Sequence, residues 1–108
     1  MGFMDIFKKT DMEGGLASCQ ATPGAVLLDV RTTCEYEEGR IPGSENLPLM
    51  QLKQIESRHP DKATPLFVYC LSGARSTQAV AELKRLGYEQ VTNLGGITDY
   101  KGKVEKDS

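Results

Sequence analysis

Short apolar runs recur along the chain, separated by polar stretches that contain turn-forming residues. The run AVLLDV at residues 25–30 follows a Pro-Gly turn signal, and the run PLFVYC occupies residues 65–70. Continuous apolar runs of this length, with β-branched and aromatic residues, are typical of strands buried on both faces. Two weaker runs, residues 45–49 and 90–94, predict two further strands, and Pro48 limits the first of these to the edge or end of a sheet.

Between these runs, apolar residues recur at helical spacing. The expected helices cover residues 11–20, 33–38, 49–59 and 73–86, and Gly87 is a natural stop for the last of them. Strands that alternate with helices indicate a parallel sheet covered by helices on both faces. The pattern therefore predicts a three-layer α/β/α fold.

Composition limits the classes of function. The chain has 108 residues, of which 39% are hydrophobic and 26% are charged, and these values are ordinary for one globular domain. A net charge of −2 argues against nucleic acid or a membrane surface as the main partner. No apolar run approaches the roughly 20 residues that span a bilayer. The lysines of the N-terminal segment follow its apolar part, unlike those of a signal peptide, so a cytoplasmic protein is expected.

The cysteine content agrees with that expectation. The three cysteines, Cys19, Cys34 and Cys70, cannot all pair with one another, and no C-x-x-C pair occurs. His59 is the only histidine, so a structural zinc site, which needs four ligands, is not expected. Free thiols suit a reducing compartment, and no metal or cofactor is predicted.

The stretch FVYCLSGARSTQAV, residues 67–80, carries the clearest chemistry, because a strand ends at Cys70 and a tight loop then leads into a helix. Ligands gather at the carboxyl ends of strands in such sheets. Gly73 favours a sharp turn whose N–H groups converge on the sulfur. The helix adds the positive end of its dipole, and Arg75 adds a full charge. All three features favour a thiolate over a thiol.

A structural explanation of Cys70 competes with this reactive one, because free cysteines in strands are commonly small buried hydrophobic residues. The combination C-x-x-G-x-R-S directly after a buried strand favours the reactive interpretation, since it brings together amides, helix dipole and arginine. Cys70 is therefore the expected nucleophile, and Ser76 is expected to support it.

Three segments, in the right order, resemble the rhodanese (sulfurtransferase) family: the loop CLSGARS, the upstream stretch LLDVRTTCEYEEGRIPGSENLPL and the downstream stretch NLGGITDYKG. The resemblance implies a rhodanese domain over residues 11–102 with a parallel sheet of about five strands, preceded by an N-terminal arm (residues 1–10) and followed by a polar C-terminal tail (residues 103–108). It also implies that Cys70 takes up a sulfane sulfur as a persulfide and passes it to a thiophilic acceptor. The substrate-binding residues that it implies are Leu71, Ser72, Gly73, Ala74 and Arg75.

Leu71 departs from the family pattern, because a basic or polar residue often stands at this position. An apolar residue weakens the local positive field, so a protein or low-molecular-weight persulfide is expected to be a better donor than the thiosulfate dianion. The expected partners are a small anionic sulfur donor and a thiol or cyanide acceptor, with a protein thiol as a further candidate. The protein is expected to be a monomer or weak dimer. Arg40 stands where family members often have histidine, and it is expected to keep only a structural role.

Two other functions stay open. A sulfur-carrier or binding module with little turnover of its own would use the same loop. A cysteine-based phosphatase or an arsenate reductase is the other alternative, but phosphatases of this kind have a Cys-x5-Arg loop. Only four residues separate Cys70 from Arg75, and so short a ring should crowd a phosphate.

Other polar residues are expected near the mouth of the same site. Asp29 and Arg31 end the first strong strand, and we expect them to form a charge-assisted network with Glu35 that fixes the surrounding loops. Cys34 lies near the same edge of the sheet. A disulfide needs Cα atoms within about 7 Å, and nothing in the sequence indicates such proximity to Cys70, so no role is expected for Cys34.

Overall fold

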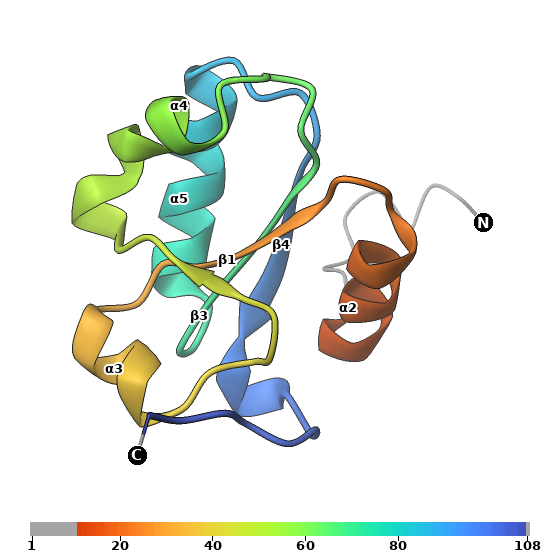
Figure 1. The fold of residues 1–108 in the computed structure, drawn as a ribbon, viewed down its shortest axis with the longest axis vertical. Coiled ribbons are helices and arrows are strands. Elements are labelled where there is room, and N and C mark those ends of the chain that lie inside the picture. The colour runs from red at the N-terminus through yellow and green to blue at the C-terminus, as the bar shows by residue number, and fades with distance from the viewer. Residues whose placement is uncertain (1–10, 108) are drawn as a thin grey trace.

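The computed structural model describes residues 11–107, and a sheet of four parallel strands forms its centre (Figure 1). Three strands lie within predicted apolar runs, and the fourth extends two residues past its run, to Gly96. The edge strand β2 has only two residues, in agreement with the limit set by the nearby Pro48. The strands lie in the order β2-β1-β3-β4, and their bounds are β1 (Val26–Asp29), β2 (Glu45–Asn46), β3 (Leu66–Cys70) and β4 (Val91–Gly96).

The expectation of about five strands is wrong by one. The fifth strand was implied by the family resemblance, and no fifth apolar run supported it. Within residues 11–107, the one bridge outside the named strands is an isolated antiparallel pair of Arg40 and Glu105. The α/β class and the parallel sheet are confirmed.

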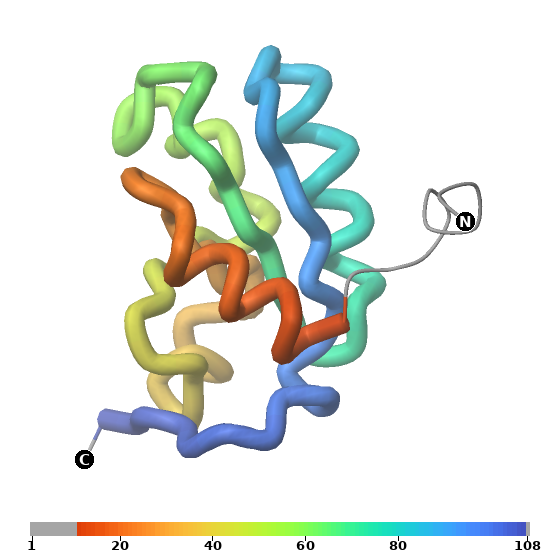
Figure 2. Tube along the Cα trace, turned by 90° about the vertical axis from the view of Figure 1, so that its right-hand side faces the viewer, coloured from red at the N-terminus to blue at the C-terminus, as the bar shows by residue number. Residues whose placement is uncertain are grey.

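Helices cover both faces of the sheet (Figures 1 and 2). Helix α2 (Met12–Ala21) packs on one face, and α4 (Ile55–Arg58) and α5 (Ala74–Arg85) pack on the other. Helix α3 (Thr33–Glu38) follows the carboxyl end of β1. None of the described helices has the length and apolar character needed to cross a bilayer.

The residues of β3 show why two helical layers form. All five are buried, and successive side chains point to opposite faces of the sheet. Leu66, Val68 and Cys70 join the apolar cluster under α5. Phe67 and Tyr69 join the second cluster, under α2. Cys70 therefore lies on the α5 face, at the end of the strand.

The helix predicted over residues 49–59 is not continuous. It begins as a 3-10 helix, η1 (Leu49–Gln54), in which Gln51 has non-helical angles (φ −112°, ψ 17°), and α-helix starts only at Ile55. Leu52 and Ile55 are three residues apart, and a 3-10 helix places such residues in line. The tighter helix therefore still buries both side chains.

Helix α5 lies within one residue of its predicted bounds, and its end has a specific cause. Gly87 adopts a left-handed φ of 103°. Its N–H donates to the carbonyl of Lys84 (3.0 Å), and the N–H of Tyr88 donates to that of Leu83 (3.1 Å). This pair of bonds is a Schellman motif, which satisfies the last carbonyls of the helix.

Residues 103–107, called here the C-terminal strap, run along the carboxyl edge of the sheet from the end of β4 toward α3 (Figures 1 and 2). Arg40 and Glu105 exchange both backbone hydrogen bonds (2.8 and 2.9 Å), and the N–H of Asp107 donates to the carbonyl of Glu37 (3.0 Å). The guanidinium of Arg40 also lies 2.8 Å from the Asp107 carboxylate. Arg40 thus anchors the strap, while the expected N-terminal arm lies outside the described residues.

Candidate active site

Cys70 is the last residue of β3, and its side chain is 1% exposed. Its Sγ accepts hydrogen bonds from the backbone N–H groups of Gly73 (3.0 Å) and Ser76 (3.3 Å). Both donors belong to the N-terminus of α5, which carries the positive end of the helix dipole. The loop therefore folds over the sulfur and directs amide donors at it.

These contacts shift the pKa of Cys70. Burial raises this pKa, because a thiolate is poorly solvated in the protein interior. Hydrogen bonds from Ser76 and from the backbone of Gly73 and Arg75 outweigh burial, so the pKa lies below its ordinary value. Cys19 provides a contrast, because burial acts there without such donors and raises the pKa of its thiol. Of these two thiols, Cys70 is the one whose surroundings favour the thiolate form.

Two glycines allow the loop to close this tightly. Gly73 has a φ of 108°, a region in which a side chain is strained. At Gly96 of β4, a Cβ atom would lie 2.3 Å from the carbonyl oxygen of Leu71 and 2.7 Å from the Cα of Ser72. The backbone of the loop therefore rests directly against β4, and glycine is required at the point of contact.

A polar network lies behind the loop, and its central residue, Asn93, was missed by the sequence analysis. The buried Ser76 hydroxyl donates to the Asn93 side-chain oxygen (2.8 Å), which also accepts from the N–H of Gly95 (2.9 Å). The Asn93 amide nitrogen donates to the hydroxyl of Thr77 (3.2 Å). These bonds join β4 to the first turn of α5 and so position the Ser76 N–H. An asparagine inside a predicted strand was the signal available in the sequence.

The guanidinium of Arg75 is engaged by a carboxylate. Its two terminal nitrogens lie 2.8 and 3.0 Å from the two carboxylate oxygens of Glu35. Glu35 also completes the capping box of α3 with Thr32. The expectation that Glu35 joins Asp29 and Arg31 is therefore wrong, because the side chain of Glu35 turns toward the loop after Cys70 and pairs with Arg75.

This ion pair should make the free energy of unfolding depend on pH in the acidic range. The hydrogen bond from Arg75 lowers the pKa of Glu35 from 4.5 to about 2. A carboxyl group with a lowered folded-state pKa stabilises the fold above its unfolded pKa, and this contribution is lost as pH falls through the folded pKa. We expect the wild type to lose more free energy of unfolding between about pH 6 and about pH 2.5 than Glu35→Gln, as measured by urea denaturation. Equal losses in the two proteins would contradict the contribution of this pair.

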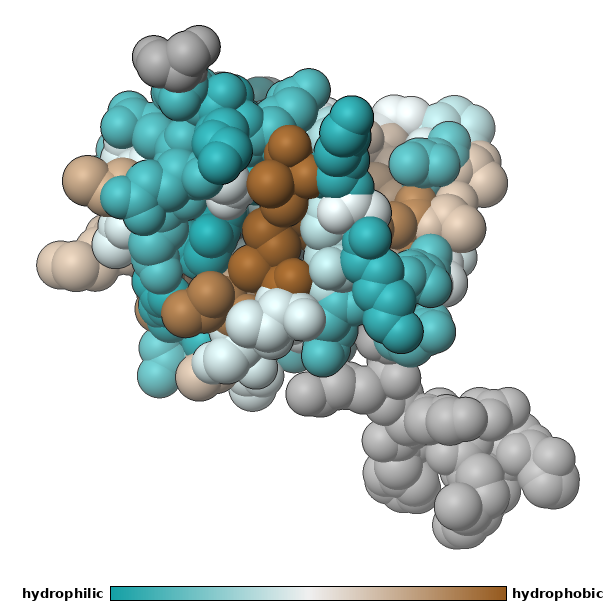
Figure 3. Space-filling view, turned by 90° about the horizontal axis from the view of Figure 1, so that it is seen from below, coloured by the Kyte–Doolittle hydropathy of each residue, from teal (hydrophilic) through white to brown (hydrophobic). Residues whose placement is uncertain are grey.

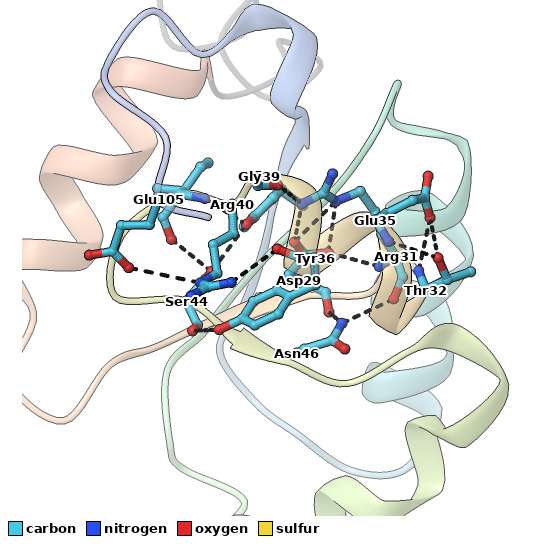
Figure 4. A network of polar contacts seen from close by, with 12 residues as sticks. Asp29, Arg31, Thr32, Glu35, Tyr36, Gly39, Arg40, Ser44, Asn46 and Glu105 are labelled. Carbon is cyan, nitrogen blue, oxygen red and sulfur yellow. Dashed lines mark hydrogen bonds and ion pairs between the residues drawn. The ribbon is translucent and has the colours of Figure 1, made fainter. Parts of the chain in front are cut away.

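Asp29 and Arg31 form a separate buried network (Figure 4). The two side chains are joined by several hydrogen bonds, the shortest of them 2.6 Å. Arg31 also donates to the carbonyl of Gly39 (2.6 Å), and the Asn46 side chain donates to the carbonyls of both Asp29 and Arg31 (3.0 Å each). This network ties the carboxyl end of β1 to β2 and to the end of α3. None of these hydrogen bonds involves the sulfur of Cys70.

The remaining predicted residues lie on the outer side of the loop. Leu71 is 42% exposed, and Ser72 and Ala74 are exposed as well. Cys34 is an exposed free thiol on α3. Within residues 11–107, no group of three histidine, cysteine or acidic side chains is placed to hold a metal ion.

Comparison with known proteins identifies the family to which this fold belongs. A family model described as the Rhodanese-like domain matches residues 12–103. The chain belongs to the rhodanese family. The match extends over Cys70 and its loop, and it confirms the resemblance drawn from the three sequence segments.

Relatives of this chain include named sulfurtransferases. Thiosulfate sulfurtransferase PspE of Escherichia coli (strain K12) is 38% identical over 73 residues, which are 67% of this chain and 70% of PspE. The uncharacterized protein YqhL of Bacillus subtilis (strain 168) is 40% identical over 83 residues, or 75% of this chain, which spans 64% of the length of YqhL. The putative sulfur carrier protein YrkF of the same organism is 34% identical, and the match covers 73% of this chain and 43% of YrkF.

Solved structures agree with the fold. A structure described as rhodanese with anions from E. coli matches with a TM-score of 0.71 and 35% identity, covering 76% of this chain and 98% of that one. The solution structure of the Rhodanese-like domain from the Anabaena sp. Alr3790 protein matches with a TM-score of 0.79 and 27% identity, covering 91% and 78%. Together the relatives support membership of a sulfurtransferase family with this α/β fold.

Proposed function

We propose that this rhodanese-like domain is a sulfurtransferase that carries sulfur as a persulfide on Cys70. The Cys70 thiolate attacks the sulfane sulfur of thiosulfate or of a persulfide, and a new S–S bond forms while the donor's own S–S bond breaks. Sulfite or a thiolate leaves with the electron pair. A thiol or cyanide then takes the outer sulfur, and the Cys70 thiolate is released. No external oxidant or reductant is needed for this cycle.

The observation that carries the proposal is the pair of amide hydrogen bonds to the Cys70 Sγ, at 3.0 and 3.3 Å. The Cys70 thiolate is the nucleophile of the first step and the leaving group of the second. Donors that stabilise the thiolate raise its concentration at neutral pH and make it a better leaving group. The lowered pKa of Cys70 supports both roles.

Arg75 argues against the phosphatase alternative. The segment from Cys70 to Arg75 is one residue shorter than a Cys-x5-Arg loop. In addition, the two terminal nitrogens of Arg75 already donate hydrogen bonds to both oxygens of the Glu35 carboxylate. A phosphate dianion would have to compete with a carboxylate whose pKa is about 2 and which therefore stays charged at neutral pH. The sulfur-carrier alternative differs from the proposal only in the rate of turnover. It stays open because one relative is named as a putative sulfur carrier protein.

Intact-mass analysis tests the proposal. The protein is incubated with thiosulfate and, separately, with a small persulfide donor. The expected result is a gain of one sulfur atom that cyanide or dithiothreitol reverses, together with repeated turnover in a steady-state assay with cyanide. A sulfur gain without turnover would assign the carrier function instead, and no gain with either donor would contradict the proposal.

Leu71→Arg should improve the use of thiosulfate. Leu71 is exposed beside Cys70, so an arginine there adds a positive charge near the path of the dianion. We expect kcat/KM for thiosulfate to rise by about three- to tenfold at low ionic strength, with a smaller gain at high salt because salt screens exposed charges. Leu71→Gln is the uncharged control. A gain that salt does not change, or equal gains in both variants, would contradict the electrostatic explanation.

A further inference from the structure

A hollow of about 440 Å³ opens beside the catalytic loop, at the carboxyl edge of the sheet. Its apolar lining comes from three separate segments: Leu71 of the loop, Ile97 of η2 (Ile97–Asp99) and Val104 of the C-terminal strap. Leu71 is 42% exposed and Val104 is 43% exposed. Figure 3 looks onto this edge and shows an apolar band across its middle. The hollow, called here the edge hollow, therefore presents apolar surface next to the loop that follows Cys70.

The wall formed by Val104 is held in place by the rest of the fold. A Cβ atom on Gly39 would lie 3.7 Å from a Val104 methyl carbon, so this side chain packs over the end of α3. The neighbouring Glu105 exchanges both backbone hydrogen bonds with Arg40. These contacts hold the strap against Gly39 and Arg40. Defined contacts with the rest of the fold therefore hold the Val104 side of the edge hollow in place.

The charges around the edge hollow do not favour a small dianion. Arg31 is paired with Asp29 at 2.6 Å, and Glu35 is paired with Arg75 at 2.8 Å. Glu38 also lines the hollow, and it forms no ion pair within residues 11–107. The lining therefore combines apolar side chains with one uncompensated negative charge. This combination complements an apolar segment that carries positive charge.

We infer that the edge hollow docks a segment of a donor protein that presents its sulfur as a cysteine persulfide, with apolar side chains beside the cysteine and a lysine or arginine opposite Glu38. This inference rests on the proposed function. The Cys70 thiolate attacks the outer sulfur of the partner's R–S–SH group, and the S–S bond within that group breaks. The proton stays on the transferred sulfur, and the partner leaves as R–S⁻. A small persulfide needs only the loop, whereas a peptide persulfide gains affinity from Leu71, Val104 and Glu38.

Two synthetic peptide persulfides test the inference. Each carries one cysteine between leucines, and they differ only in having two lysines or two glutamates nearby. The rate of persulfide formation on Cys70 is followed by intact mass, and each rate is divided by that of the same peptide with dithiothreitol to remove differences in intrinsic reactivity. We expect the lysine peptide to react about tenfold faster than the glutamate peptide at low salt, and this ratio to shrink at high salt.

Substitutions in the lining of the edge hollow test whether this hollow causes the preference for the lysine peptide. Glu38→Gln should reduce the preference for lysine, and Val104→Ser should slow both peptides several-fold without slowing a small neutral persulfide. Met50→Ser is the matched control, because Met50 is a 97% exposed apolar residue of η1 that does not line the edge hollow.

Equal rates for the two peptides, or equal effects of Val104→Ser and Met50→Ser, would overturn the docking inference. So would a wild-type dimer that Val104→Ser dissociates, since a second copy of the chain would then be the occupant. Failure of every donor, small persulfide included, would instead overturn the proposed function.

Discussion

Cys70→Ser is expected to abolish sulfur transfer and to leave the fold intact. The serine hydroxyl occupies nearly the same space and can accept the hydrogen bonds that Gly73 and Ser76 donate to the sulfur. The free energy of unfolding should therefore change by about 1 kcal/mol or less. A hydroxyl cannot carry a sulfane sulfur, so both the mass gain and the formation of thiocyanate from cyanide should fall below detection.

Cys34→Ser is the matched control for this substitution, because it removes an exposed thiol from α3 by the same change of atom. It should keep the full rate of sulfur transfer. Transfer that survives in Cys70→Ser would remove Cys70 from the mechanism. A Cys34–Cys70 disulfide in non-reducing peptide maps, together with slow turnover of Cys34→Ser, would show that a second thiol takes part.

Local patterns in the sequence predicted the parts of the fold that depend on local physics. The apolar runs at residues 25–30 and 65–70 are long and uninterrupted, and they became the two central strands. The stop at Gly87 was readable because a left-handed residue after the last turn is a local requirement. The loop chemistry was readable for the same reason, since the donors to Cys70 come from residues three and six positions later.

The parts that could not be predicted depend on contacts between distant residues. Arg75 finds Glu35 across 40 positions, and the side chain of Arg40 finds Asp107 across 67. Each of these residues had other charged candidates in the sequence, so residue type alone did not select the pair. The edge hollow has the same origin, because three segments far apart in the chain supply its apolar wall.

At Gly96, a local sequence signal and a contact between distant residues coincide. Of the substitutions considered, Gly96→Ala should have the second largest effect on sulfur transfer. The sequence shows a Gly-Gly pair at the end of a strand, which is a turn signal, yet Gly96 itself has an ordinary extended conformation (φ −113°, ψ 145°). What requires glycine is space, because a Cβ atom would collide with the backbone of Leu71 and Ser72. Backbone atoms cannot rotate away as a flexible side chain can, so Gly96→Ala must push the loop off β4.

We expect Gly96→Ala to lose about 1–3 kcal/mol of unfolding free energy, as typical of overpacked sites, and to slow persulfide formation by about tenfold or more. The displaced loop should also withdraw amide donors from Cys70, so the pKa of its thiol should rise toward the value that burial alone imposes. The pH dependence of iodoacetamide alkylation measures this shift directly. Gly43→Ala is the control: unlike Gly96, Gly43 has a φ of 86°, at which a side chain is strained, but a Cβ there would meet no atom within 4 Å. It should lose stability without any change in the alkylation curve. An unchanged curve for Gly96→Ala would show that the contact with β4 does not hold the donors on the sulfur.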